Sequence, residues 1–396
     1  KIPDVSCKPN HSKLLQTEYY PIFAKKNLTM LQNWLSPIEL SKLSATTESN
    51  VKTFDKSILV YENQFPDLSE TQIAFIGIGY QSDMIRKALY ELVFPFKNLK
   101  IADLGNARKD DISFLIPIIK ELLDSGIFPI ILGLEEHLTL AQFQAHKSRQ
   151  ALVNIAIVDE RIRYNAVDAT SPKDYLNAIL KTKEPNLFHL GIIGSQVHFI
   201  SEDAQKLFDL DHLENTGLGK VKSDIESIEP LIRDADLLSF SISAIKQSEA
   251  PGLLRPTPSG LFSEEACQIC RYAGMSDKLS SFGIYGYSAI HDNEDQTAKV
   301  IAQMIWYFID GFSNRKFDFP ATNEGLVEYI VEIDQLEEQL TFWKSNKSGR
   351  WWIQVPVKTK EQHDRHHLIP CSYTDYKMAC KEELPERLIN AFKKFS

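Results

Sequence analysis

Three short polar segments of the chain each follow an apolar run and carry side chains that could bind a metal or form ion pairs. These side chains are Glu136 and His137 in the first segment, Asp159, Arg161 and Arg163 in the second, and Ser241 and Ser243 in the third. Carboxylates and imidazoles bind divalent cations, whereas a guanidinium stays protonated and has no lone pair to donate. The segments therefore combine metal ligands with side chains that repel a metal ion.

The spacing within the second and third segments predicts that their side chains share one cleft. Residues at i, i+2 and i+4 of an extended segment project to the same face, so Asp159, Arg161 and Arg163 should point together. The same reasoning holds for Ser241 and Ser243. An unpaired buried charge costs on the order of several kcal/mol. We therefore predict a network of Asp/Glu–Arg ion pairs in this cleft.

The segments that position these residues have the pattern of an α/β protein. Short apolar runs alternate with amphipathic helical stretches between about residues 70 and 315; the runs are 73–77, 101–104, 129–132, 153–158, 187–193, 237–240 and 281–285. Strands that are apolar on both faces and separated by helices are typical of a parallel sheet covered on both sides. We therefore predict a three-layer α/β/α fold with a mainly parallel sheet.

The pattern divides the chain into three parts. We expect an N-terminal extension at 1–65, the α/β domain at 66–315, and a C-terminal appendage at 316–396 made of an antiparallel hairpin and a closing helix near 382–395. Within the α/β domain we expect helices at 111–125 and 297–311, and we expect Gly311 to be the C-cap of the second.

Composition excludes several classes of protein. The 396 residues have a formal net charge of -9 and scattered basic residues, which argues against a nucleic-acid partner. No apolar run is long enough to span a membrane. The five cysteines are odd in number and widely spaced, which favours the reducing cytoplasm. Because the sequence begins with Lys1 and not with Met, earlier removal of an export signal peptide is left as an open alternative.

Two smaller clusters allow a metal-site interpretation. Cys267 and Cys270 have redox or metal spacing, but they lie in a helical stretch without a second cysteine pair, so we expect buried helix cysteines. His363, Asp364, His366 and His367 have ligand types at short spacing. A solvated loop explains that cluster better than a surface metal site does.

The three polar segments also resemble the metal-binding motifs of the ureohydrolase family, which includes arginase, agmatinase and formimidoylglutamase. The matching stretches are 133–137, 159–163 and 239–243 running on to Ala250-Pro251-Gly252. Stretches at 101–105, 271–274, 351–352 and 369–373 are similar to a divergent bacterial branch labelled formimidoylglutamase-like. The resemblance implies an arginase-like fold, two manganese ions that generate a hydroxide, and assembly into trimers or hexamers.

This sequence departs from the family at almost every ligand. Glu136 stands where the family has a histidine, and His137 is displaced by one; Arg161 replaces a histidine and Arg163 an aspartate; Ser241 and Ser243 replace two bridging aspartates. Asp159 is kept. Gly286 lies roughly where the family has a glutamate that holds the substrate. The six positions that correspond to family ligands, together with the displaced His137, form our candidate for a degenerate former metal site, at residues 136, 137, 159, 161, 163, 241 and 243.

Two hypotheses follow from the resemblance and its departures. The favoured one is a non-catalytic relative without a metal cofactor, which has a structural or regulatory role, binds a protein partner or assembles as a homo-oligomer, and has a cleft that could take a small ligand. The alternative is an active manganese-dependent hydrolase of an amidine or guanidine substrate with rearranged ligands, in which His137 would join Glu135 and Asp159.

Overall fold

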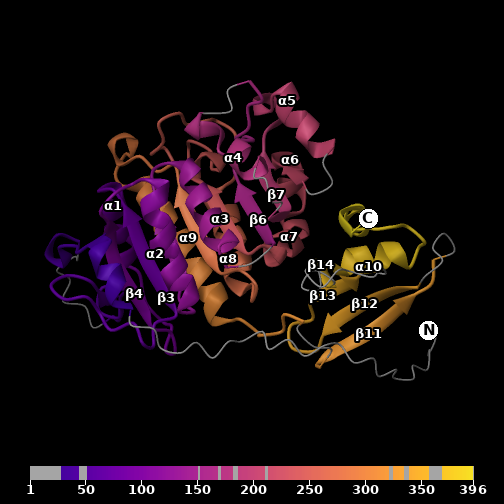
Figure 1. Cartoon of the computed structure of the whole chain (residues 1–396), viewed down its shortest axis with the longest axis horizontal. Coiled ribbons are helices and arrows are strands. Elements are labelled where there is room, and N and C mark those ends of the chain that lie inside the picture. Colours follow the sequence, from indigo (N-terminus) through magenta and orange to yellow (C-terminus); the bar gives the residue numbers. More distant parts are fainter. Residues whose placement is uncertain are drawn as a thin grey trace.

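The computed structural model describes residues 28–43, 51–149, 152–167, 171–181, 186–209, 213–320, 324–333, 339–355 and 368–395, which form a large α/β domain and a smaller C-terminal sheet (Figure 1). The strands are β1 Leu35–Ser36, β2 Leu59–Val60, β3 Ile73–Ile78, β4 Ile101–Ala107, β5 Phe128–Leu132, β6 Val153–Val158, β7 Leu187–Ser195, β8 Leu213–Gly217, β9 Leu237–Ser241, β10 Ser281–Tyr285, β11 Leu326–Val331, β12 Leu340–Ser345, β13 Trp351–Gln354 and β14 Leu368–Cys371. The α-helices are α1 Gln81–Tyr90, α2 Ile112–Asp124, α3 Thr139–Lys147, α4 Leu176–Leu180, α5 Glu202–Gln205, α6 Leu218–Ser223, α7 Glu229–Asp234, α8 Ser263–Met275, α9 Gln296–Ser313, α10 Tyr373–Ala379 and α11 Glu386–Phe395.

The main sheet confirms the predicted parallel architecture. Its strands follow the order β1-β4-β3-β5-β10-β9-β6-β7-β8, and all neighbouring pairs are parallel except β1 with β4. The polar segments follow β5, β6 and β9, and β10 lies between β5 and β9. Because parallel strands end at the same edge of a sheet, these segments meet above the carboxyl ends of the central strands.

Helices cover both faces of this sheet, as the three-layer prediction requires. Phe75 of β3 packs in the core cluster that contains α1, α8 and α9, whereas its neighbour Ile76 packs in the cluster that contains α2 and part of α3. This alternation follows from the period of two in a strand. Both faces of β3 are buried, which explains why its sequence is a continuous apolar run.

The predicted N-terminal extension contributes to the main sheet. β1 pairs antiparallel with β4 through Leu35 and Ala107, and β2 pairs parallel with β4 through Leu59 and Ala102. These two-residue strands therefore cover one edge of the sheet, an arrangement that blocks pairing with another chain. They are too short to give an alternating pattern, so the sequence did not reveal them.

The predicted helices are present, with one wrong terminus. Asp111 caps α2, and its side chain accepts a hydrogen bond of 2.9 Å from the Phe114 amide. The expectation that Gly311 is the C-cap of α9 is wrong, because α9 continues to Ser313. A Cβ at Gly311 would lie 2.3 Å from the Arg271 carbonyl oxygen. Close packing against α8, and not a left-handed cap, explains this glycine.

The C-terminal appendage is larger than the predicted hairpin and helix. Four antiparallel strands, β11 to β14, pair in sequence order and pack against α10 and α11. The appendage lies beside α7 of the main domain (Figure 1). Arg233 of α7 is 4% exposed, donates to the carbonyl oxygens of Trp351 and Cys371 at 3.1–3.2 Å, and lies 4.6 Å from the Trp352 ring. A buried arginine thus fixes the appendage to the main domain.

The cysteines of α8 lie where the sequence predicted them. Cys267 and Cys270 are both buried in α8, and burial raises the pKa of Cys267 to about 12. The cluster of His363, Asp364, His366 and His367 lies outside the described residues. None of the helices in the described part of the chain has the length and apolar character needed to cross a bilayer.

Candidate functional site

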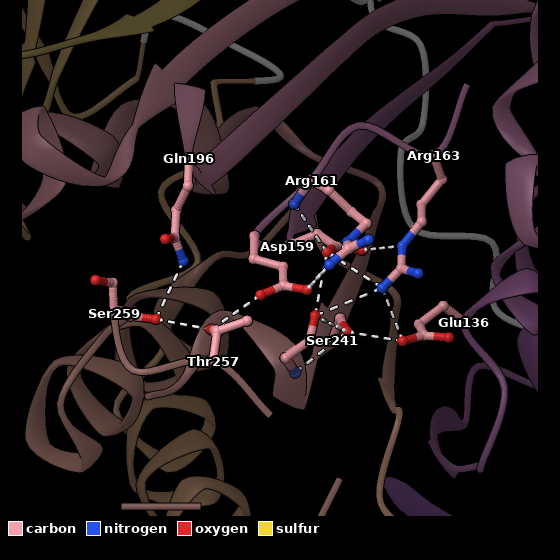
Figure 2. A network of polar contacts seen from close by, with 10 residues as sticks. Glu136, Asp159, Arg161, Arg163, Gln196, Ser241, Thr257 and Ser259 are labelled. Carbon is pink, nitrogen blue, oxygen red and sulfur yellow. Dashed lines mark hydrogen bonds and ion pairs between the residues drawn. The ribbon is translucent and has the colours of Figure 1, made fainter. Parts of the chain in front are cut away.

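The centre of the site is the guanidinium of Arg163, which joins two carboxylates from different segments. Its Nε lies 2.8 Å from Asp159 Oδ2, and its Nη2 lies 3.3 Å from Asp159 Oδ1. The same Nη2 donates to Glu136 Oε1 at 2.8 Å. Asp159 follows β6 and Glu136 follows β5, so one arginine connects the ends of two strands of the sheet (Figure 2).

Two serine hydroxyls complete this network from the end of β9. Ser241 ends the strand and donates to Glu136 Oε1 at 3.1 Å. Ser243 lies in the 3-10 helix Ile242–Ala244 and donates to Asp159 Oδ1 at 3.2 Å. The two hydroxyl oxygens are 2.8 Å apart. Five of the seven predicted residues, which are Glu136, Asp159, Arg163, Ser241 and Ser243, are therefore in mutual contact.

Arg161 does not point into this network, which corrects the expectation that it would share the cleft with Arg163. Its Nη2 donates to Glu160 Oε1 at 2.6 Å, and its guanidinium lies 4.6 Å from the Phe199 ring centroid. Only its backbone amide contacts Asp159, at 3.1 Å. The reason is that β6 ends at Val158, so the alternation of an extended strand does not apply to the residues that follow.

Glu160 connects Arg161 to a second group of polar residues that the sequence did not indicate. Its Oε2 accepts from the Thr257 hydroxyl at 3.0 Å, and the same hydroxyl lies 2.9 Å from the Ser259 carbonyl oxygen. Gln196 donates its side-chain amide to that carbonyl at 3.1 Å (Figure 2). A charged residue at the end of a buried apolar strand was the one signal that could have identified Glu160.

In the described part of the chain, His137 forms no hydrogen bond or ion pair with this network. It lies half-buried in the 3-10 helix Glu136–Leu138, which begins directly after the exposed Glu135. The Thr139 hydroxyl donates to the Glu136 carbonyl oxygen at 2.7 Å and contacts the Ser239 hydroxyl at 2.6 Å. The backbone that carries Glu136 is therefore tied to β9, while His137 is left beside the site.

Gly286 borders the network where the resemblance placed a substrate-holding glutamate. Its φ is +90°, a backbone conformation that residues with a side chain rarely adopt. A Cβ built there would lie 3.2 Å from Glu136 Oε1 and 3.4 Å from Ser241 Oγ. The glycine thus allows the loop after β10 to approach the network closely.

The charges of the site explain the directions of its pKa shifts. Burial raises the pKa of Glu136; Arg163 opposes this change and Asp159 adds to it. Burial alone would lower the pKa of Arg163, but Asp159 and Glu136 outweigh burial and raise it. Arg163 therefore stays cationic, and Glu136 holds a proton more readily than an ordinary glutamate.

This arrangement does not fit the pair of manganese ions that the resemblance implies. Both oxygens of Asp159 accept hydrogen bonds, and the Arg163 guanidinium lies between Asp159 and Glu136, where a cation shared by these carboxylates would need to be. Serine hydroxyls occupy two further ligand positions. Among the residues that the structure describes, no three His, Cys, Asp or Glu side chains gather as a metal site.

The chain matches known proteins over this same region. The model of the arginase family matches residues 76–310, which is more than half of the chain. A formimidoylglutamase of Staphylococcus haemolyticus (strain JCSC1435) is 31% identical over 86 residues, which cover 21% of this chain and 28% of that protein. This alignment therefore spans less than a third of the relative.

Solved structures with the same fold align with most of this chain and with nearly all of their own length. A formimidoylglutamase from Bacillus subtilis subsp. subtilis str. 168 has a TM-score of 0.61 at 16% identity and covers 69% of this chain and 96% of its own. A Trypanosoma cruzi formiminoglutamase with Mn²⁺ has a TM-score of 0.56 at 16% identity and covers 70% and 98%. These likenesses establish the fold, and the family match establishes the lineage. The chain belongs to the arginase family.

Proposed function

We propose that this chain is a non-catalytic member of the arginase family, in which an ion-pair network has replaced the metal site. The observation that carries the proposal is the position of Arg163, whose guanidinium contacts both Asp159 and Glu136 at 2.8 Å. A permanent cation held there supplies the positive charge that two carboxylates need, but it cannot bind or activate water as a Lewis acid does.

The remaining polar groups of the network do not offer another catalytic device. Ser241 and Ser243 contact each other and donate to carboxylates that Arg163 also contacts, and in the described residues neither is hydrogen-bonded to the histidine base of a serine triad. The raised pKa of Glu136 comes from burial beside Asp159. We interpret these groups as a stabilising network, and we propose that the protein acts by binding.

The proposed binding role is supported by the loops around the site. Three of them carry exposed apolar side chains: Val197 after β7 is 83% exposed, Leu254 after β9 is 71% exposed, and Ile290 after β10 is 78% exposed. These side chains lie on loops at the same edge of the sheet, and we infer that they contribute to a surface that contacts another molecule. A second copy of the chain or a different protein is the proposed partner, and the molar mass in solution distinguishes self-association from a monomer.

Metal analysis of the purified protein tests the loss of the metal site. After incubation with manganese chloride and removal of the excess, we expect far less than one manganese per chain and no turnover of formimidoylglutamate, arginine or agmatine. Stoichiometric manganese together with turnover of any of these would overturn the proposal. The alternative hydrolase with rearranged ligands would then hold.

A variant that restores the ligand types provides the matched control. It combines Arg161→His, Arg163→Asp, Ser241→Asp and Ser243→Asp, and it should bind manganese more tightly than the natural chain because it replaces two cations with metal ligands. Folding of this variant is checked by circular dichroism. Equal manganese binding by both proteins would show that Arg163 does not decide the chemistry of the site.

A further inference from the structure

A large groove opens at the edge of the main sheet opposite the site network. Its volume is about 990 Å³, and it is bordered by Gln72, Phe128 and Ser280, which lie at the amino ends of β3, β5 and β10. The site network lies at the carboxyl ends of the central strands. The groove is therefore a separate feature of the fold, and its size is that of a small-molecule binding site.

The floor of the groove is aromatic. Phe128 and Phe312 both line it, and their ring centroids are 5.7 Å apart. Phe96 and Leu279 are buried beneath the lining, and the partly buried Leu99 adds accessible apolar surface. Such a floor favours a ligand with an apolar body, because contact with the ligand removes apolar surface from water.

The charges around the groove are mainly basic in a chain whose net charge is -9. Its basic lining residues are Lys97, Arg149, Lys278 and Arg315, and its acidic ones are Asp277 and Asp310. Three of these residues have ion-pair partners outside the lining: Arg149 pairs with Asp124, Lys278 with Asp234, and Asp310 with Arg271. Within the lining itself, four basic residues stand against two acidic ones.

Arg315 joins the basic rim to the aromatic floor. Its guanidinium lies 4.0 Å from the Phe312 ring centroid and 5.6 Å from that of Phe128. It also donates to the carbonyl oxygens of Gly274 and Leu279 at 2.9 and 3.0 Å. The cation is thus fixed in place over the rings and does not need to be ordered when a ligand binds.

Phe317 holds an exposed aromatic ring at the groove in an unfavourable backbone conformation. Its φ is +50°, and its side chain is 64% exposed. The next amide, that of Asp318, donates to Asp277 Oδ2 at 2.9 Å, and Lys347 donates to the Phe317 carbonyl oxygen at 3.3 Å. A strained residue that presents an apolar ring to water is typical of a binding site.

We propose that this groove binds a small amphipathic monoanion, namely an aliphatic or aromatic carboxylate that is free in solution. Its apolar body would lie on Leu99, Phe312 and Phe317, and its carboxylate would face Lys97 and Arg315. The excess of basic over acidic residues in the lining favours an anionic head group. This site is independent of the proposed loss of the metal site.

Calorimetric titration with decanoate tests the proposal on the full chain. We expect saturation at one site per chain, and decylammonium of the same length should bind at least about tenfold more weakly because it reverses the charge. Equal affinity for both amphiphiles, or no saturable binding of decanoate, would overturn the proposal. So would binding to phosphatidylglycerol vesicles without binding of decanoate, because a lipid surface would then be the ligand.

Two variants test whether decanoate binds in the groove. Lys97→Glu should weaken binding about fivefold or more by reversing a rim charge. Phe317→Gly removes the ring and relieves the positive φ, so it should weaken binding while the protein stays folded. Lys377→Glu reverses a charge on α10 that does not line the groove and should leave the affinity unchanged. If the first two variants bind decanoate like the natural chain, the groove is not the site.

Discussion

Arg86 and Arg163 each pair with a buried aspartate of the main sheet, but they do so in different settings. Arg86 of α1 is completely buried, and its Nε and Nη2 lie 2.8 and 3.0 Å from the two oxygens of Asp103 in β4. The hydroxyl of Tyr90 donates to the same carboxylate at 2.9 Å. Arg163 lies in a loop, and its side chain is 14% exposed.

The two arginines also differ in where their carboxylates lie. Arg86 contacts Asp103 of β4 and Asp83 of its own helix, whereas Arg163 contacts Asp159 and Glu136, which follow two different strands. The first arrangement ties one helix to one strand. The second holds three strand ends together around a point where the family resemblance implies metal. This comparison indicates that the same type of ion pair can join a helix to a strand or, as we propose for Arg163, occupy the position of a metal site.

The largest expected effect is that of Arg86→Met. This change leaves Asp103 without a cation at a position where no water reaches it, so we expect a loss of about 3–5 kcal/mol in the free energy of unfolding. Urea denaturation measures the loss. A cost below that of the corresponding change at Arg163 would mean that burial does not decide the strength of the two pairs.

A smaller loss of about 2–3 kcal/mol is expected for Arg163→Leu, because Asp159 keeps its hydrogen bonds from Ser243 and from the Arg161 amide, and the side chain of Glu136 is 20% exposed. Removing Arg161 as well should cost more, because Glu160 is 2% exposed. Arg271→Leu, which breaks a partly exposed pair with Asp310, serves as the control and should cost less than about 1 kcal/mol. A double Leu variant at least as stable as the natural chain would contradict the proposed network.

Gly286→Ala examines how tightly the network is packed. The new methyl group would require a positive φ and would press on Glu136 and Ser241, so we expect a loss of about 1–2 kcal/mol. Gly79→Ala is the matched control, because φ is +74° there but no atom lies within 4 Å of the new Cβ. Thermal unfolding of both variants should show a greater loss at Gly286. Equal losses would indicate backbone strain alone.

The smallest effect is a pH dependence that arises from Glu136. Its pKa is raised in the folded protein by burial, so the folded state binds the proton more tightly than the unfolded state. The contribution of Glu136 to stability is therefore greatest at low pH and falls as the pH rises from the ordinary range of a glutamate through the raised value. Glu136→Gln cannot ionise. Between about pH 4 and about pH 7, the natural chain should lose stability relative to this variant; the opposite trend would contradict the assignment.

Apolar runs predicted the central strands of the fold, because strands that are buried on both faces consist mainly of apolar residues. β8 was not predicted, since its sequence Leu-Glu-Asn-Thr-Gly is polar and lies near one end of the sheet. The short strands β1 and β2 lack any periodic signal. The appendage was expected to be a hairpin with a closing helix, whereas its sheet has four strands.

The residues of the site were predictable from their spacing, but their contacts were only partly so. Asp159, Arg163 and Ser243 lie together because the ends of parallel strands meet. Arg161 turns away because the chain leaves the strand at Val158, a boundary that residue types do not fix. Its partner Glu160 was overlooked for the same reason. The interpretation of this cluster as a former metal site stays a prediction.

Arg233 has a consequence for how the molecule denatures. Its guanidinium is fully enclosed between α7 and the strands that carry Trp351 and Cys371, where it donates to backbone carbonyl groups of the appendage. Separating the appendage would expose these carbonyl groups and would leave Arg233 with only its ion pair to Glu229 of the same helix among the contacts described for it. Detachment of the small sheet is therefore coupled to disruption of the larger body, and the two should melt in one cooperative transition.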